Sequence, residues 1–230
     1  MTLKTLPGEP PVEITLRRTA RARRFSLRVS QLDGRVTLSM PARAREAEAL
    51  AFAHDKAAWI RQMLAGTPQR QTVAPGQTVL FEGRQLMVAF SKVRAVRVES
   101  DHLLVPGDIT RAGARVQAFM KLAARQRLQS ASEYYSAKLN RPFRRITLRD
   151  TRSRWGSCTA DGNLMYSWRL IMAPPAVLDY VAAHEVAHLA EMNHSPAFWA
   201  TVARLMPDFK AHRHWLRSHG AALHKVDFGG

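Results

Sequence analysis

The chain has 230 residues with a single cysteine, Cys158, so it cannot form an intramolecular disulfide bond. Its formal charge is +17, from 35 Lys and Arg against 18 Asp and Glu, and 46% of its residues are hydrophobic, a composition that excludes both an acidic protein and a disordered one. There is no run of about 18 apolar residues, so no transmembrane helix is expected, and the N-terminal "MTLKTLPGEPPVEI" lacks the apolar segment of a signal peptide, so a cytoplasmic location is expected.

The first predicted elements are β-strands between residues 12 and 40. The stretches "VEITLRR" and "FSLRVSQLDGRVTLSM" alternate apolar and polar side chains, which is typical of strands with one buried face. Asp33-Gly34 predicts a hairpin turn inside the second stretch. A helix is predicted next over residues 45–66, because apolar residues recur at helical spacing and Gly66 can end it. Its apolar stripe consists of Leu50, Ala53, Ala57, Ile60 and Leu64.

A polar segment with Pro and Gly at 67–76 predicts a linker or a surface crossing. Short alternating segments over 78–105 predict further strands, which complete a β-rich N-terminal region of residues 1–108. A long helix over 111–139 then opens the C-terminal region, residues 109–230.

The C-terminal region is predicted to contain two strands, over 144–150 and 163–173, which a loop separates. Three helices are predicted after them, each with a proline at its start: from Pro174-Pro175 to about residue 191, from Ser195-Pro196 to about residue 206, and from Pro207-Asp208 to His219-Gly220. A β-rich region followed by a mostly helical one indicates an α+β fold.

The stretch "AAHEVAHLAEMNHSPAFW" (182–199) contains two histidines four residues apart, with a glutamate directly after the first. On an α-helix such positions share one face and lie about 6 Å apart along the axis, so His184 and His188 can both reach one divalent metal. Glu185 is rotated by about 100° from His184, which lets it hydrogen-bond a water at the metal without binding the metal itself. This H-E-x-x-H spacing predicts a metal site, and a helix that is merely rich in histidine is the alternative.

A catalytic zinc site uses three protein ligands and leaves one position for water, so a third ligand is needed. Glu191 shares the helical face but lies about 10 Å along the axis from His184, too far for a shared metal. His194 can join if the chain turns back after about residue 191, and Asn193 suits a left-handed cap in such a turn. The predicted metal ligands are therefore His184, His188 and His194, with Glu185 as the catalytic residue.

With Zn²⁺ bound, the expected chemistry is hydrolysis. The metal lowers the pKa of its water towards 7 and polarises a substrate carbonyl. Glu185 then takes the water's proton as general base and can pass it to a leaving amine. The predicted function is that of a zinc-dependent metallopeptidase acting on a peptide or protein.

Three stretches resemble the YgjP-like metallopeptidase family, a group of zincins related to the SprT-like and WLM metalloproteases: "RWGSC" (154–158), "GNLMYSWRLIMAPPAVLDYVAAHEVAHLAEMNHSPAFW" (162–199) and "RHWLRSHG" (213–220). The resemblance is strong over residues 140–220 and weaker over the N-terminal strands. It implies a zincin-like core with a long backing helix at 111–139, a small sheet and an active-site helix. It also implies zinc bound by His184, His188 and His194, with Glu185 catalytic.

Several other side chains carry a choice between a structural and a functional role. The strand "NLMYSWRLIMA" is either an ordinary packed strand or a sheet edge that pairs with an extended substrate. The tryptophans of the C-terminal region are expected in the core, and Cys158 is expected to be a small buried thiol rather than a redox-sensitive one. The candidates for stabilising an oxyanion are Tyr166, His212, Arg213, His214 and His219.

Two arginine clusters, "RRTARARRFSLR" (17–28) and "RPFRRITLRDTRSR" (141–154), have six arginines each. Guanidinium groups pair with phosphate and carboxylate, so an anionic partner such as nucleic acid or a nucleotide is expected, with a solvated strand face as the alternative. Two further functions therefore stay open. One is a metal-dependent phosphohydrolase acting on nucleotides, and the other is a nucleic-acid-associated protease.

Overall fold

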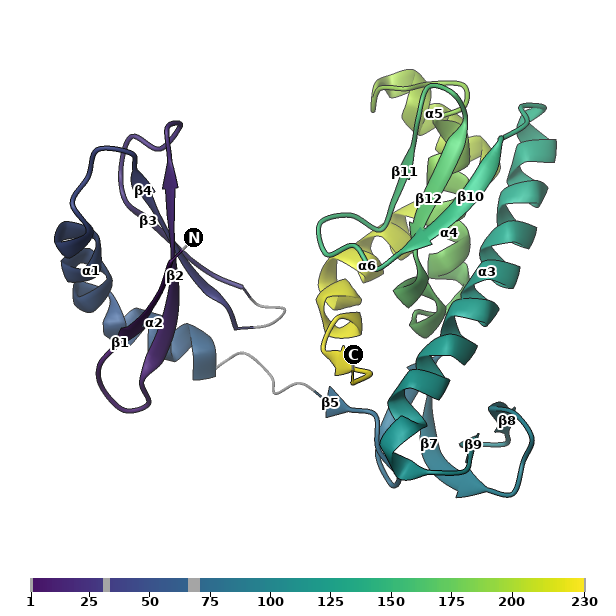
Figure 1. The fold of residues 1–230 in the computed structure, drawn as a ribbon. Helices are drawn as coiled ribbons and strands as arrows, with labels where there is room; N and C mark the ends of the chain where they lie inside the picture. The colour runs from purple at the N-terminus through teal and green to yellow at the C-terminus, as the bar shows by residue number, and fades with distance from the viewer. Residues whose placement is uncertain (1, 31–33, 66–70, 230) are drawn as a thin grey trace. The chain divides into compact units, whose positions relative to one another are not determined.

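The computed structural model shows an α+β protein, as predicted, with its strands and helices arranged as in Figure 1. It describes residues 2–30, 34–65 and 71–229. The predicted turn residue Asp33 and the predicted helix end at Gly66 lie outside these ranges. Across the described residues, no helix combines the length and the apolar character that crossing a membrane requires.

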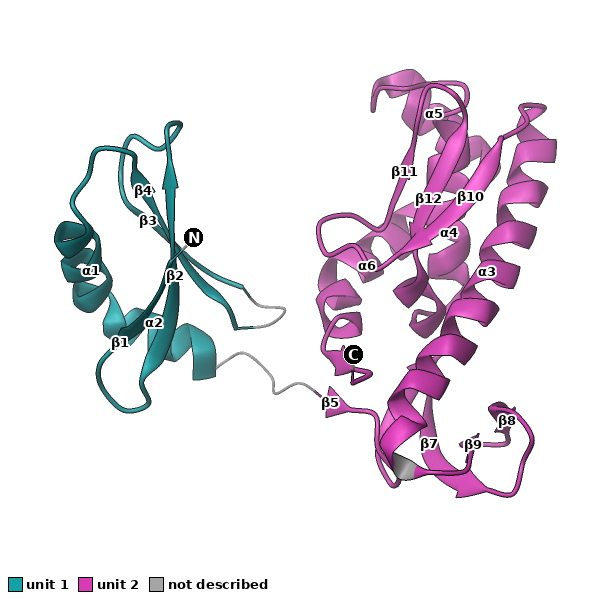
Figure 2. Cartoon of the chain, in the orientation of Figure 1, with its two compact units in different colours: residues 1–70 teal, residues 71–230 magenta. Residues whose placement is uncertain are grey.

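The chain divides into two compact units, unit 1 with residues 1–70 and unit 2 with residues 71–230 (Figure 2). The boundary inferred from the sequence, between residues 108 and 109, falls inside unit 2. The physical reason is a shared core: Val79 and Leu103, from the strands before that boundary, are buried in the same hydrophobic cluster as the long helix that follows it.

Unit 1 contains a four-stranded sheet in the order β1-β2-β4-β3. Its strands are β1 (Thr2–Leu6), β2 (Val12–Thr19), β3 (Ser26–Val29) and β4 (Val36–Pro41). The β2–β4 pair is parallel, and the other two pairs are antiparallel. Strand β1 was not predicted; most of its residues are exposed, and it is held by pairing with β2.

Two helices, α1 (Glu46–Asp55) and α2 (Ala57–Ala65), pack against this sheet where the sequence predicts one. The helix is interrupted at Lys56, whose backbone N–H donates to the carbonyl of Ala53 at 3.2 Å. This three-residue spacing ends the α-helical hydrogen-bond pattern. Ile60 of the predicted apolar stripe is fully buried. The remaining core of unit 1 consists of Leu6, Val12, Ile14, Leu16, Val29, Val36, Leu38, Met40, Ala49 and Ala53.

Unit 2 begins with a second four-stranded sheet, ordered β6-β7-β9-β8, which confirms the strands predicted over 78–105. Its strands are β6 (Thr78–Phe81), β7 (Arg84–Ser91), β8 (Arg97–Glu99) and β9 (His102–Pro106). A short parallel pair, β5 (Gln71–Thr72) with β13 (Val226–Asp227), joins the start of the unit to its end.

The long helix predicted at 111–139 is confirmed as α3 (Ala112–Leu139), which follows a short 3₁₀ helix, η1 (Ile109–Arg111). It ends at Asn140, whose φ of 54° and ψ of 43° place it in the left-handed conformation that commonly ends helices. One face of α3 is buried against the rest of unit 2, by residues spaced three and four apart: Val116, Met120, Ala124, Leu128, Ala131 and Tyr135.

A third sheet, ordered β10-β12-β11, lies beside α3 and α4. Its strands are β10 (Arg145–Arg149), β11 (Gly156–Cys158) and β12 (Asn163–Ser167). Strand β12 is shorter than the predicted strand, because the chain after Ser167 forms a fully buried 3₁₀ helix, η2 (Trp168–Met172). Strand β11 lies in a segment that was expected to be a loop.

Three helices complete unit 2: α4 (Pro175–Ala187), α5 (Pro196–Leu205) and α6 (Phe209–Leu223). Helix α5 begins as predicted, with the Ser195 hydroxyl oxygen accepting a hydrogen bond from the Phe198 N–H at 3.3 Å. Helix α4 ends at Ala187, earlier than predicted, and this early end shapes the candidate site.

Candidate metal centre

The three histidines singled out in the sequence come together at the end of α4 and in the segment that follows it. His184 lies in the last turn of α4, His188 directly after it, and His194 just before α5. The ring centroid of His184 lies 5.1 Å from that of His188 and 5.1 Å from that of His194. The centroids of His188 and His194 are 4.9 Å apart. Each ring offers one nitrogen, and these three nitrogens all lie within 4.8 Å of one another.

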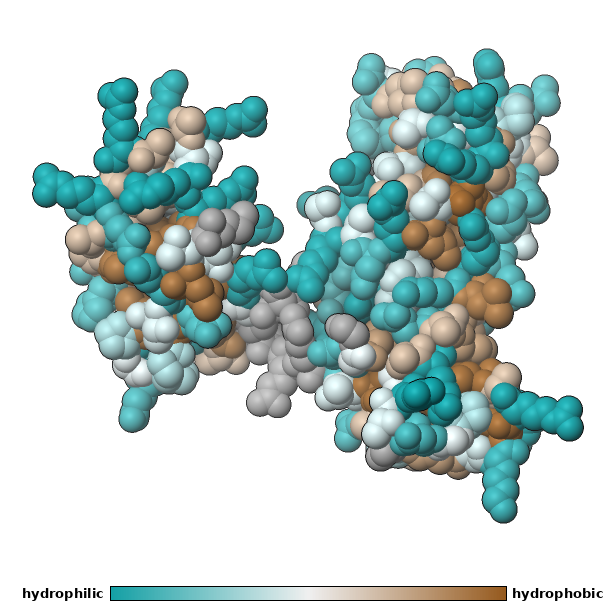
Figure 3. All heavy atoms as spheres, viewed as in Figure 1, coloured by the Kyte–Doolittle hydropathy of each residue, from teal (hydrophilic) through white to brown (hydrophobic). Residues whose placement is uncertain are grey.

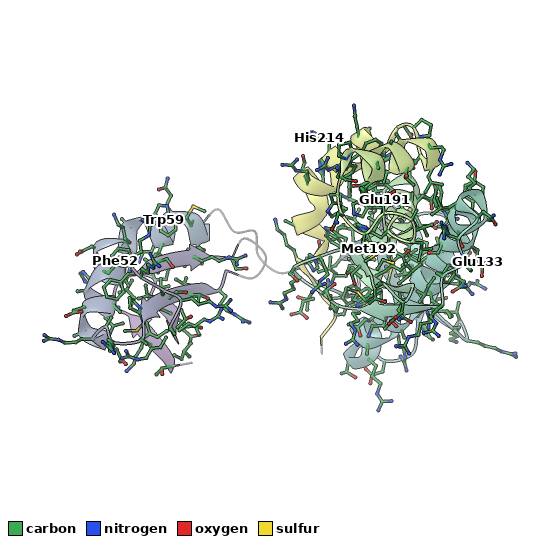
Figure 4. The ribbon with its side chains drawn as sticks, turned by 90° about the horizontal axis from the view of Figure 1, so that it is seen from above. Phe52, Trp59, Glu133, Glu191, Met192 and His214 are labelled. Atoms are coloured by element: carbon green, nitrogen blue, oxygen red, sulfur yellow. The ribbon has the colours of Figure 1, made fainter. Side chains whose placement is uncertain are left out.

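The turn that brings His194 back differs from the predicted one. Because α4 ends at Ala187, the N–H groups of Leu189 and Ala190 bond to carbonyls three residues earlier, so the turn starts before residue 191. The prediction of a left-handed cap at Asn193 is wrong, since the described non-glycine residues with positive φ are other ones. Instead, the Asn193 carbonyl accepts from the N–H of Ser195 at 2.7 Å. Figure 4 labels Glu191 and Met192 in this segment.

The geometry of the nitrogens fits a divalent metal. Two ligand nitrogens at about 2.0–2.1 Å from a tetrahedral zinc lie about 3.3 Å apart, and the Nε2 atoms of His184 and His194 are 3.1 Å apart. His188 Nδ1–H donates to the Glu191 carbonyl oxygen at 2.9 Å, which leaves Nε2 of His188 with its lone pair. Metal-binding histidines typically donate their second N–H to a carbonyl in this way.

Burial keeps these imidazoles in the neutral form that binds metals. It lowers the pKa of His184 to about 3, and the neighbouring charges of His188, His194 and Arg213 act in the same direction. Burial also lowers the pKa of His188, although its hydrogen bond to the Glu191 carbonyl acts the other way. Because a ligand must be deprotonated, no proton has to leave these two rings when a metal binds at neutral pH.

Glu185 lies in α4 beside His184 and is 5% exposed. Burial raises the pKa of its carboxyl to about 8, and the positive charge of Arg154 acts in the opposite direction. The carboxyl group packs on the backbone of β11: a Cβ placed on Gly156 would lie 2.5 Å from Glu185 Oε1 and 2.6 Å from its Cγ. Glycine at residue 156 therefore provides the space that the carboxyl group occupies.

An aromatic side chain that the sequence did not single out supports all three histidines. The ring of Phe198 is fully buried, and its centroid lies 4.9 Å from His184, 4.4 Å from His188 and 4.8 Å from His194. Phe198 lies in the first turn of α5 and His194 precedes that helix, so helical spacing does not predict their contact. Trp199 stacks on His194 at 5.7 Å.

Among the candidates for stabilising an oxyanion, the structure separates Arg213 from Tyr166. Tyr166 is fully buried with its hydroxyl group 3.0 Å from Ser132 Oγ, so it belongs to the core. Arg213 is exposed, stacks on the Trp199 ring with its guanidinium carbon 4.4 Å from the centroid, and lowers the pKa of His184. It is therefore the candidate whose charge reaches the histidines.

The other candidates of α6 are accounted for by contacts outside the histidine cluster. His212 Nε2 lies 2.9 Å from Asp208 Oδ2. His214 is exposed (Figure 4), and so is His219, whose Nδ1 lies 3.1 Å from the Trp215 carbonyl oxygen. These contacts favour a structural or solvated role for each of the three.

The neighbouring sheet presents β11, not β12, as an edge towards Glu185. The segment considered as a substrate-pairing edge contains β12, but β12 is the central strand, flanked by β10 and β11. Cys158 ends β11, and burial raises the pKa of its thiol to about 11, so the thiol stays protonated at neutral pH. Its S–H donates to the Thr159 carbonyl oxygen at 3.3 Å, as expected for a structural thiol.

Two histidines one helical turn apart, a buried glutamate between them and a third histidine beyond a turn are the features of H-E-x-x-H metallopeptidases as a class. The family model described as YgjP-like, metallopeptidase domain, matches residues 23–219. The chain belongs to the YgjP-like metallopeptidase family, as its sequence resemblance predicted. Membership implies a metal-dependent hydrolase that acts on peptides.

A solved structure similar to this chain is the crystal structure of the metallopeptidase zymogen of Pyrococcus abyssi abylysin. The two are 20% identical, and the similarity covers 42% of this chain and 92% of that chain with a TM-score of 0.34. A TM-score of this size is too low to show a common fold. The search of the curated proteins found no match.

Proposed function

We propose that this chain is a zinc-dependent metallopeptidase in which His184, His188 and His194 hold the metal and Glu185 is the general base. The observation that carries the proposal is the convergence of three imidazole nitrogens within 4.8 Å of one another. Neutral imidazole nitrogens suit zinc, and a three-histidine set leaves one coordination position open for catalysis. A structural zinc site generally has four protein ligands, which favours the catalytic alternative.

Zinc bound there would supply Lewis acidity, lowering the pKa of a bound water and polarising the substrate carbonyl. The protein's own contribution is to hold the Glu185 carboxyl group beside that position, where the positive charge of a bound metal would lower its raised pKa and favour the carboxylate. Glu185 accepts a proton from the attacking water and passes it to the leaving amine. Its contact with the backbone at Gly156 fixes the carboxyl group, which supports a positioned base rather than a mobile surface acid.

The substrate is proposed to be an extended peptide lying along β11. An edge strand has unpaired backbone N–H and C=O groups that can add a further strand. Among the described strands, β11 is paired on one side only, with β12, and it touches both α4 and the Glu185 carboxyl group. A peptide added there would have its backbone next to the general base.

The proposal is tested with Glu185→Gln in the zinc-loaded chain. Casein hydrolysis is expected to fall by roughly a hundred- to ten-thousandfold, the usual contribution of a general base, while one zinc per chain is retained. The matched control is Glu133→Gln, at an exposed position on α3 (Figure 4). This variant is expected to keep full activity. Turnover that survives in Glu185→Gln contradicts the assignment of the base, and hydrolysis of nucleoside triphosphates without cleavage of casein favours the phosphohydrolase alternative.

A further inference from the structure

The sheet of unit 1 has one face packed against its helices and one open face. Along β2, Val12, Ile14 and Leu16 are buried, whereas Thr15 and Arg17 lie on the opposite side and are more exposed. The same alternation runs through β3 and β4, because successive side chains of a strand point to opposite faces. Polar residues thus share the open face.

The strand register orders these residues in two rows across the sheet. Thr37 of β4 is the partner of both Thr15 and Arg28, and Ser39 is the partner of both Arg17 and Ser26. We name this set the arginine face: Thr15, Arg17, Ser26, Arg28, Thr37 and Ser39. Arg17 and Arg28 lie two strands apart and two residues out of step, so their Cα atoms are about 12 Å apart.

The charge around the arginine face is mostly positive, and the exposed Glu13 of β2, two residues before Thr15 on the same open face, is the exception. The loop between β2 and β3 adds three exposed arginines, Arg21, Arg23 and Arg24, and residues 14–30 contain no Asp or Glu. Figure 3 shows hydrophilic side chains projecting from the end of unit 1 towards which β2 runs. The acidic residues of α1 belong to the helical layer, where Glu46 pairs with Lys4 at 2.7 Å.

We propose that the arginine face binds double-stranded nucleic acid through its phosphate backbone. Guanidinium and hydroxyl groups are the donors that contact phosphate oxygens in such complexes. Two arginines about 12 Å apart can each neutralise a different phosphate, and the loop arginines extend the positive surface. This function is separate from the proposed peptidase chemistry, which uses residues of unit 2.

A duplex suits this face better than a single strand does. Proteins that bind single strands stack bases on aromatic side chains, and the two rows contain none. The nearest ring in the sequence, Phe25, belongs to the opposite side, where it stacks on Phe52 of α1 with the centroids 5.7 Å apart. The face therefore offers backbone contacts without a stacking surface, which fits binding that does not depend on base sequence.

The test compares the full chain with the double variant Arg17→Gln/Arg28→Gln. Binding to a fluorescent 20-base-pair DNA duplex, an RNA duplex of equal length and the single strand is measured by anisotropy between 50 and 200 mM salt. We expect the duplexes to bind, and the variant to bind roughly ten- to a hundredfold more weakly at 100 mM salt. The slope of log K against log salt should become smaller by about 1.8, since each phosphate contact contributes about 0.9.

The matched control, Arg45→Gln/Lys56→Gln, removes the same charge from exposed residues at the ends of α1. It should leave the slope of the duplex complex unchanged. An equal loss in both variants would mean that net charge alone drives binding, and it overturns the proposal. Three further results would overturn the proposal: no binding of the duplex at 50 mM salt, tighter binding of the single strand than of the duplex, and tighter binding to vesicles of anionic lipid than to the duplex. Casein hydrolysis by Arg17→Gln/Arg28→Gln is expected to be normal, so failure here is distinguishable from failure of the proposed peptidase.

Discussion

Gly156 and Glu185 are in direct contact where β11 meets α4. A Cβ on Gly156 would lie 2.5 Å from Glu185 Oε1 and 2.6 Å from its Cγ, well inside the separation at which non-bonded atoms attract. Gly156 is not among the glycines with positive φ. The need for glycine here thus comes from the space that the carboxyl group fills and not from the backbone conformation.

Gly156→Ala is therefore expected to move the Glu185 carboxyl group without disturbing the histidines. A displacement of about 1 Å can cost roughly a hundredfold in rate. We expect kcat for casein to fall by about that factor, with the zinc content by mass spectrometry unchanged. Ser157→Ala, one residue further along β11, is the control and should retain full activity. Full activity of Gly156→Ala would show that the contact with Glu185 is not needed for catalysis.

Removal of one candidate ligand tests the metal site itself. His188→Ala should bind zinc at least about a hundredfold more weakly, because two nitrogens cannot complete the three-ligand set. Zinc affinity is measured by competition with a chromogenic chelator. His219→Ala, an exposed histidine of α6, is the control and should bind zinc as the unaltered chain does. Equal affinities of the two variants would remove His188 from the proposed site.

Arg169 connects distant parts of unit 2. It is 9% exposed, pairs with both carboxylate oxygens of Asp150 at 2.7 and 3.1 Å, and donates to the carbonyls of Leu223 and Val226 at 3.0 Å each. Arg169→Lys cannot make the same set of hydrogen bonds, because an ammonium group lacks the planar arrangement of guanidinium donors. It should lower the free energy of unfolding by about 3 kcal/mol. Asp150→Asn should cost less, because the Asp150 side chain is 43% exposed. Urea unfolding followed by tryptophan fluorescence measures both, and the reverse order would contradict this account.

His224 should lower the stability of the metal-free chain in mild acid. Burial, followed by the positive charge of Arg169, lowers the pKa of His224 from its ordinary value of 6.5 to about 4. The unfolded chain therefore binds this proton more tightly, so stability is fully present above pH 6.5 and is lost as the pH falls towards 4. His184 and His188 act in the same direction, whereas Glu185, whose pKa burial raises to about 8, acts in the opposite direction.

The comparison with His224→Gln isolates this residue. Between pH 7.5 and pH 5 the melting temperature of the variant should rise relative to that of the unaltered chain, since one group that destabilises the folded chain in acid has been removed. Differential scanning fluorimetry of both metal-free proteins gives the two values. An identical change in both proteins would show that His224 does not contribute.

Elements whose signal is local were predictable from the sequence. The alternation in β2 and β4, the 28-residue α3 and the Ser195 cap all depend on residues within a few positions of each other. The single helix predicted over 45–66 was wrong because its apolar period continues through Lys56, where the backbone breaks. The spacing of apolar residues indicates which face of a helix is buried, but it does not indicate where the helix is interrupted.

The convergence of the three histidines was predictable, because His184 and His188 have helical spacing and the chain starts a new helix directly after His194, at Ser195-Pro196. The role of Glu185 stays a prediction. The contact between Gly156 and Glu185 was not predictable, since β11 forms by pairing with β12, six to ten residues further on in the chain, and by packing on α4. The support from Phe198 was not predictable either, because its contacts with all three rings depend on the turn after Ala187.

The pairing of β5 with β13 has a consequence for engineering unit 2. Gln71 is in register with Val226, and Thr72 with Asp227, so the start of this unit lies next to a strand close to its end. A short artificial loop from Gly229 to Gln71 would therefore span little distance, and new ends opened in an exposed turn elsewhere would yield a circularly permuted unit with its sheets intact.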